Sequence, residues 1–257
     1  MRGVYASGIQ AEMKLKDIMK KVVLSVLLVA VMATFSPVYG SVGNEMISTF
    51  NGGEKATIVL VGEGTATIDW GDGSKEETYN LEGEEDSCSW EYSQTSPRTI
   101  KITGENITEL YCSEIELANL DVSHCPALRI LKCNDNQLTS LDITKNTMLI
   151  ELNCTNNQLT SLDVSNNIAL AELFCGRNQL TNLDASKNTA MTEYLSVYAN
   201  QFSTEALNAL FNALPHGNDG TIFIMDNPGT NTCDPSIATD KGWNVVMEDD
   251  EIEWIEE

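Results

Sequence analysis

The middle of the chain contains the segment Leu131-Lys132-Cys133-Asn134-Asp135-Asn136-Gln137-Leu138-Thr139-Ser140-Leu141-Asp142. Its second half recurs almost unchanged twice, at a spacing of 21 residues each time. The three copies begin at Asn136, Asn157 and Asn178. Leu110 belongs to a degenerate first copy, and a fifth copy with one extra residue ends at Phe202. A fixed period of this length is typical of a solenoid, in which each copy forms one coil. The sequence therefore predicts about five stacked coils over residues 107–202.

Each copy follows the pattern L-x-C-x-x-N-x-L, which predicts a short strand followed by a turn. In the strand, Leu131 and Cys133 point to the same side because side chains alternate with a period of two. The asparagine turns the chain off the strand, and its amide can satisfy backbone groups that the turn leaves unpaired. This position holds Asn136, Asn157, Asn178 and Asn200. The rest of the coil is too short for a full helix, so we expect an extended or 3₁₀ return path.

Four cysteines follow the same register and form a column with a spacing of 21 residues. They are Cys112, Cys133, Cys154 and Cys175. Val197 occupies the fifth place, which indicates a site for a small apolar side chain, a role that a free thiol fulfils. A zinc site needs converging ligands, and a disulfide needs facing Cβ atoms, whereas ladder side chains run parallel. We therefore expect buried thiols and no metal. Cys125 shares a column with Asn146, Asn167 and Asn188 and is expected to be buried as well.

These copies resemble the internalin-type leucine-rich repeats of bacterial surface proteins, in particular the subgroup with a cysteine ladder. The resemblance covers about 100 residues. It implies a β-rich α/β solenoid, a right-handed superhelix, and a secreted or surface-exposed binding protein, often an adhesin. Two features depart from that family. The chain has no LPxTG-like sorting motif, and its N-terminal flank is unlike the helical cap of internalins.

Residues 1–40 are predicted to be an export signal, with some surplus residues at the start. Lysines precede an apolar run from Val22 to Phe35, which is too short for a membrane-spanning helix but suits a signal peptide. Small residues before Ser41 favour cleavage there, so the exported chain has no expected transmembrane segment. Its 10 basic and 36 acidic residues make nucleic acid an unsuitable partner. The expected location is secreted, at the cell surface, or periplasmic.

Two flanks are expected to close the ends of the solenoid, because a repeat stack exposes apolar ends. Residues 43–106 alternate in strand-like runs, and 68–74 resemble the W-G-D-G-S signature of PKD-like β-sandwich domains. Asp69 and Asp72 suit a structural turn better than a calcium site. Residues 203–257 predict an α/β cap and an acidic tail. In that cap, Ser203 caps an amphipathic helix, and 220–225 and 243–247 form strands.

The sequence contains no recognisable catalytic motif, so we expect a binding protein that is not an enzyme and needs no cofactor. Outward strand positions on the concave face of the solenoid are the candidate ligand-binding residues. They are Tyr111, Lys132, Asn153, Phe174, Ser196 and Tyr198. Exposed aromatic side chains beside a lysine are typical of protein interfaces. The expected partner is therefore a protein at a cell surface, and the alternative is a glycan that stacks on tyrosine and phenylalanine rings.

Overall fold

The structure is a computed structural model that describes residues 44–50, 55–92 and 97–248. These described residues form one compact unit. The predicted export signal and the acidic tail after residue 248 lie outside the described residues. Within the described ranges, no helix is both long enough and apolar enough to cross a bilayer.

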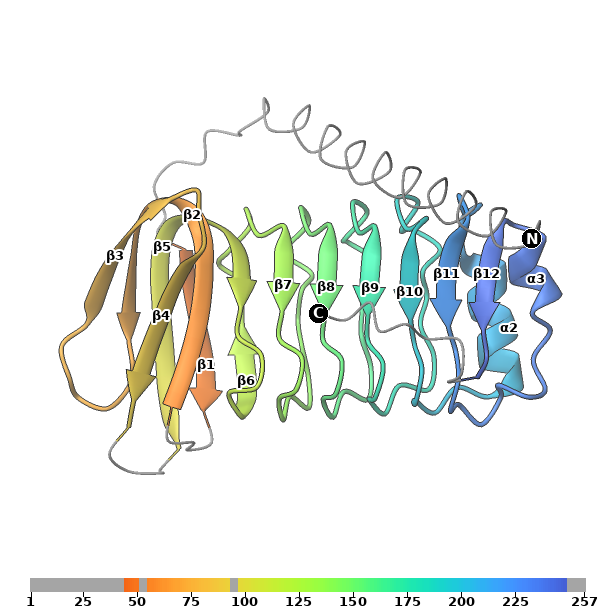
Figure 1. The fold of residues 1–257 in the computed structure, drawn as a ribbon, viewed down its shortest axis with the longest axis horizontal. Coiled ribbons are helices and arrows are strands. Elements are labelled where there is room, and N and C mark those ends of the chain that lie inside the picture. The colour runs from red at the N-terminus through yellow and green to blue at the C-terminus, as the bar shows by residue number, and fades with distance from the viewer. Residues whose placement is uncertain (1–43, 51–54, 93–96, 249–257) are drawn as a thin grey trace, which may run out of the picture. The chain divides into compact units, whose positions relative to one another are not determined.

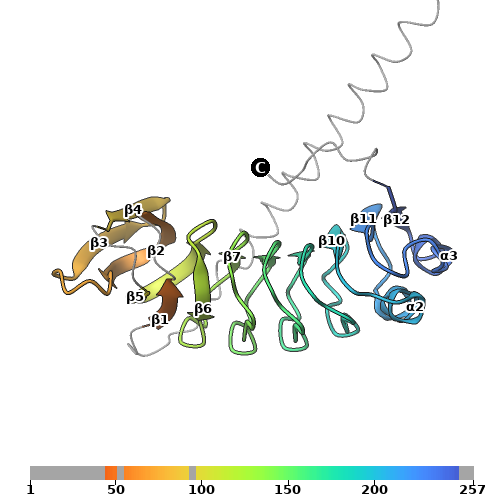
Figure 2. The ribbon, with the colours of Figure 1, turned by 90° about the horizontal axis from the view of Figure 1, so that it is seen from below.

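The repeats form parallel strands that stack in register, one per coil (Figure 1). The strands are β7 (Ile130–Lys132), β8 (Glu151–Asn153), β9 (Glu172–Phe174) and β10 (Tyr194–Ser196). Their central leucines pair in one row, as in Leu131 with Leu152 and Leu152 with Leu173. The predicted solenoid is therefore confirmed. Between these strands the chain returns through turns without a helix, as expected from the length of the coil (Figure 2).

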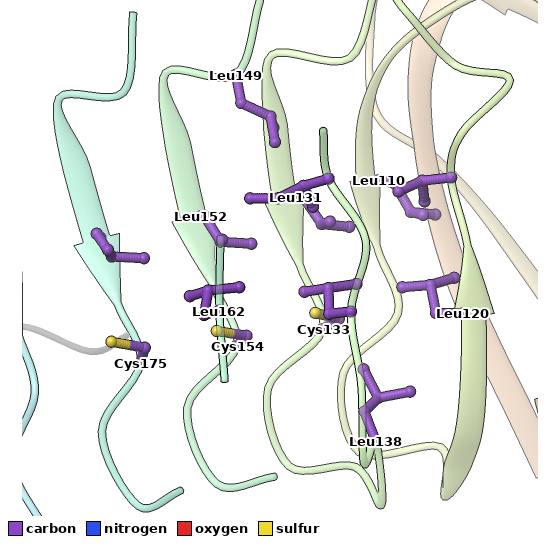
Figure 3. Packing of buried hydrophobic residues seen from close by; sticks show 14 of the residues in the cluster. Leu110, Leu120, Leu131, Cys133, Leu138, Leu149, Leu152, Cys154, Leu162 and Cys175 are labelled. Carbon is purple, nitrogen blue, oxygen red and sulfur yellow. The ribbon is translucent and has the colours of Figure 1, made fainter. Parts of the chain in front are cut away.

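The core runs through the coils as continuous columns of leucine and cysteine (Figure 3). Leu131, Leu152 and Leu173 are fully buried, and the cysteine two residues after each is buried as well. Apolar burial contributes about 25 cal/mol per Å², so every added coil extends one shared core.

The N-terminal flank consists of antiparallel strands that join the repeat sheet directly. They are β1 (Asn44–Phe50), β2 (Lys55–Asp69), β3 (Glu77–Glu82), β4 (Asp86–Glu91), β5 (Arg98–Tyr111) and β6 (Leu117–Asp121). Strand β2 runs through Gly62 without a break. A Cβ on Gly62 would lie 2.2 Å from the carbonyl oxygen of Asn106, so the close approach of β2 and β5 requires glycine there.

Strand β5 links the two parts of the molecule. It pairs antiparallel with β2 and β1, and its last residues, Glu109–Tyr111, pair parallel with β7. The predicted boundary between residues 106 and 107 therefore falls inside a continuous strand. The first coil begins on the same strand that completes the N-terminal sheet.

The C-terminal flank continues the parallel sheet with two more strands. They are β11 (Gly220–Phe223), which pairs with β10, and β12 (Trp243–Val246), which pairs with β11. Between β10 and β11 lies α2 (Thr204–Ala213), and α3 (Ser236–Thr239) precedes β12. The Ser203 hydroxyl accepts from the amide N–H of Ala206, which confirms the predicted helix cap. Lys241 donates to three carbonyl groups at the end of α2, where the helix leaves acceptors unpaired.

Candidate functional site

The candidate site is the outer surface of the parallel sheet, which we call the strand face. Two columns of side chains line it, on the opposite side from the leucine column. The first is Glu109, Ile130, Glu151, Glu172 and Tyr194, and the second is Tyr111, Lys132, Asn153, Phe174 and Ser196. The strand pairing brings neighbours of each column together, one from each coil. The sequence register therefore places these columns correctly.

The six predicted ligand-binding residues divide into two groups by exposure. Tyr111, Lys132 and Asn153 are half-buried and reach the surface. Phe174, Ser196 and Tyr198 are only 9%, 2% and 7% exposed. The exposure predicted for the Phe174 and Tyr198 rings is therefore wrong. The reason is local packing, which alternation along a strand does not reveal. Phe174 stacks on Tyr194, and the Tyr198 ring lies over Gly176, which has no side chain to keep it away.

Tyr111 and Lys132 belong to a polar network at the start of the strand face. The Lys132 ammonium group lies 3.1 Å from a Glu151 carboxylate oxygen and 5.7 Å from the centre of the Tyr111 ring. The Tyr111 hydroxyl donates to Glu109 at 2.7 Å. Burial, and then this hydrogen bond and the nearby carboxylates, raise the pKa of Tyr111, so the phenol stays protonated. The network holds one ammonium group, one phenol and two carboxylates in fixed positions.

Glu172 lies next to this network without a cation of its own among the described residues. Its strand partner is Glu151, so two carboxyl groups start from neighbouring positions of adjacent strands. Burial, followed by the charges of Glu151 and Glu193, raises the pKa of Glu172 to about 7, and Lys132 lowers it only in part. A carboxyl group with this pKa exchanges its proton close to neutral pH. The sequence pattern gives no sign of the altered pKa of Glu172.

The strand face is held rigid by the asparagine turns behind it. Asn157 is typical: its amide oxygen accepts from the N–H of Leu138, and its amide nitrogen donates to the carbonyls of Cys133 and Cys154. Each bond to a neighbouring coil fixes the spacing of the strands. Equivalent bonds are made by Asn136, Asn178 and Asn200.

Asn227 extends this ladder by one coil that the repeat search does not find. Its amide oxygen accepts from Phe202, and its nitrogen donates to the carbonyls of Val197 and Ile224. The insertion of α2 lengthens the spacing from the preceding asparagine to 27 residues, which hides the repeat. The local signal is the segment Ile222-Phe223-Ile224-Met225-Asp226-Asn227, which keeps the spacing of the L-x-C-x-x-N pattern.

The thiols of the cysteine ladder are buried and are not accessible to a reactant or a metal ion. All seven cysteines lie within the described residues and are free thiols. Burial raises the pKa of Cys112 and Cys154 to about 12, and it also raises the pKa of Cys133 and Cys175. A protonated, buried thiol is neither a good nucleophile nor a metal ligand. These four side chains therefore serve packing.

The acidic turn of the N-terminal flank is occupied by its own hydrogen bonds. Asp69 accepts from the N–H of Gly71, and Asp72 accepts from the N–H of Ser74 and from the Trp90 indole. Trp70 is fully buried beside Trp90, with 6.3 Å between the ring centres. Both carboxylates are thus part of a structural turn. Among the described residues, no group of three or more histidine, cysteine or acidic side chains is arranged to hold a metal ion.

Parallel strands at a 21-residue period, an inward leucine column and an asparagine ladder define this chain as a leucine-rich repeat solenoid. It is similar in structure to the functional domain of InlJ from Listeria monocytogenes, which includes a cysteine ladder, with a TM-score of 0.46 and 28% identity over 55% of this chain and 29% of that one. It is also similar to the internalin InlF from Listeria monocytogenes, with a TM-score of 0.39 and 19% identity over 54% of this chain and 46% of that one. The chain thus spans less than half the length of either. No protein-family model and no curated protein matches it.

Proposed function

We propose that this chain is an exported binding protein, not an enzyme, that recognises a protein partner at the bacterial cell surface through its strand face. The observation that supports this function is the row of Tyr111, Lys132 and Asn153 on consecutive strands. These side chains are half-buried and reach the surface outside the leucine core. An aromatic side chain, a cation and an amide held on a rigid sheet are suited to an interface, because little conformational entropy is lost on binding.

The same geometry favours a protein over a glycan. A sugar ring stacks on an open aromatic face, but Lys132 lies over the Tyr111 ring and Glu109 holds its hydroxyl. Phe174, the other ring in that column, is buried against Tyr194. A protein partner can instead pair with the charged groups of the network and cover it from water. Export is supported by the basic and apolar segments before residue 40, which lie outside the described residues.

The proposal is tested by cross-linking and capture on intact cells of the source bacterium and on its host surfaces. The bait is the purified chain, compared with a variant that carries Tyr111→Ala, Lys132→Ala and Asn153→Ala together. The matched control is Ile168→Ala, since Ile168 is 60% exposed in a return turn away from the strand face. A partner that the triple variant loses and the control keeps supports the proposal, provided that circular dichroism shows both folds intact. A partner that the triple variant retains contradicts it, and a reproducible hit restricted to a glycan array favours the alternative.

A further inference from the structure

The charges of the strand face are not balanced around β8 and β9. Glu109, Glu151, Glu172 and Glu193 contribute four carboxyl groups at and beside the first column, and Lys132 contributes one ammonium group. Lys132 is already paired with Glu151. Glu172 therefore has no ion pair of its own among the described residues, and Lys132 offsets the surrounding carboxylates only in part. A positively charged group brought by a partner would complement this surface.

An aromatic pair lies beside the unpaired carboxyl group. Tyr194 is the strand partner of Glu172 on β10, and Phe174 follows Glu172 by two residues on the same face. The two rings stack with 6.4 Å between their centres and 24° between their planes. Ring faces attract cations, and a guanidinium group both stacks on rings and binds carboxylates through two parallel hydrogen bonds. Phe174 is buried, so the half-buried Tyr194 ring is the aromatic surface beside Glu172 that an arginine side chain can reach.

A second polar group without a partner lies further along the same face. The Thr155 hydroxyl is buried, with the residue 5% exposed, and it has no hydrogen bond within the described part of the chain. Thr155 follows Glu151 by four residues and so faces the same side of the sheet. An extended peptide rises about 3.3 Å per residue, so groups about four residues apart in a partner match this separation. A buried hydroxyl without a hydrogen-bond partner is unfavourable, which favours a partner group that satisfies it.

We propose that the strand face binds an extended basic segment of a partner protein, with Glu172 receiving one arginine or lysine side chain. This inference rests on the proposed function and specifies the partner. The segment lies along β8 and β9, with its cation beside Glu172 and the half-buried Tyr194 ring. A polar side chain about four residues away approaches Thr155. Lys132, in the second column, repels cations from the neighbourhood of Glu151 and so favours Glu172 as the place for the basic group.

The test uses an array of synthetic nonapeptides on an alanine–serine background, each with a single arginine, lysine, glutamine or glutamate at one position. The full chain is the probe at pH 8. We expect arginine and lysine at one position to strengthen binding at least about tenfold over glutamine. Glu172→Gln should lose this preference. Glu76→Gln should keep it, because Glu76 is exposed in the N-terminal flank and its replacement removes the same charge elsewhere. Absence of a preference, or a preference that Glu172→Gln retains, overturns the inference.

A pH series with the best arginine nonapeptide separates a specific ion pair from general attraction to an acidic protein. In the free chain, burial and the neighbouring carboxylates hold the pKa of Glu172 at about 7. Since the cation binds the ionised form, affinity should rise about tenfold between pH 6 and pH 8. Glu172→Gln should give a flat profile, and a pH dependence that persists in that variant contradicts the role of Glu172.

The two proposals fail in different ways. If a captured protein needs Tyr111, Lys132 and Asn153 but binds Glu172→Gln with unchanged affinity, the basic segment is wrong and the binding face stands. If the captured protein survives the triple variant, the proposed function itself is wrong.

Discussion

At the level of single residues, the ladder asparagines hold neighbouring coils together through buried hydrogen bonds. Asn157 links the turns of two coils through Leu138, Cys133 and Cys154. We expect Asn157→Ala to lower the free energy of unfolding by about 1–3 kcal/mol, because buried backbone groups lose their partners. Urea denaturation measures the change. Asn182→Ala is the control, since Asn182 is exposed and, within the described part of the chain, its side chain makes one long hydrogen bond of 3.5 Å. Equal effects of the two substitutions would contradict the ladder's role.

Glu172 gives the stability of the chain a characteristic pH dependence. Its pKa rises from 4.5 in the unfolded chain to about 7 in the folded one. The protonated form is therefore favoured by folding, and this contribution is present below pH 4.5 and is lost as the pH rises through 7. We expect Glu172→Gln to stabilise the chain at pH 8 by about 1–2 kcal/mol, after allowance for solvent screening, and by less at pH 5.

The measurement is a pair of urea denaturation curves at pH 5 and pH 8 for the wild type and the variant. Taking the difference removes the carboxylates that both proteins share, such as Asp142 and Asp163, whose pKa values are lowered by hydrogen bonds from the residue two positions later. A variant that is less stable than the wild type at pH 8 would show that ionised Glu172 is well solvated.

Sequence reasoning at this scale succeeds where a residue repeats and fails where its environment is unique. Alternation and the 21-residue period place Glu151, Lys132 and Phe174 in the correct columns. The burial of Phe174 depends on one neighbour, Tyr194, and that of Tyr198 on the glycine at position 176. These contacts occur once in the chain, so the 21-residue period cannot predict them.

At the level of elements, each turn that directly follows one of the strands β7 to β11 contains one residue in the left-handed region. The φ values there are 56° for Asp135, 54° for Asn156, 49° for Arg177, 49° for Ala199 and 59° for Asp226. None is glycine, and Ala199 also lacks a polar side chain that would ease the strain. We expect Ala199→Gly to stabilise the chain by about 0.5–1 kcal/mol. Thermal unfolding, monitored by circular dichroism, measures this change in stability.

The matched control is Ala190→Gly, because Ala190 has no positive φ and lies in a return turn. There, glycine only adds freedom to the unfolded chain, so a loss of similar size is expected. Destabilisation by both substitutions would indicate that the backbone at Ala199 is relaxed.

The elements themselves were predicted well wherever the pattern is long. The buried face of α2, which includes Leu207, Leu210 and Phe211, follows from helical spacing. The sequence pattern did not show that β11 and β12 continue the repeat sheet, because helix α2 breaks the period before Asn227. It also did not show that β2 is a single strand, since Gly62 and Gly64 resemble a turn in a sequence.

At the level of the whole molecule, β5 makes the N-terminal flank and the repeats share backbone hydrogen bonds. Its first half completes the antiparallel sheet, and its end starts the parallel one. Solenoids are stabilised chiefly by contacts between neighbouring coils, so a terminal coil needs a partner that covers its apolar end. Here the antiparallel flank covers that end, and strand β5 belongs both to the flank and to the first coil. Loosening the flank should therefore weaken the coils next to it.

We expect residues 43–257 to unfold in a single cooperative transition. Ile68→Ala in β2 and Phe211→Ala in α2 remove fully buried side chains at opposite ends of this unit, with expected losses of about 2–5 kcal/mol each. If the unit is cooperative, both variants shift the same urea transition. The unfolding curve from tryptophan emission then coincides with the curve from far-ultraviolet circular dichroism, both measured under reducing conditions. Trp70 and Trp90 report on the N-terminal flank, and Trp243 reports on the last strand. A biphasic curve in Ile68→Ala, with the repeat transition left in place, would instead show that β5 can release the flank while its last residues stay paired with β7.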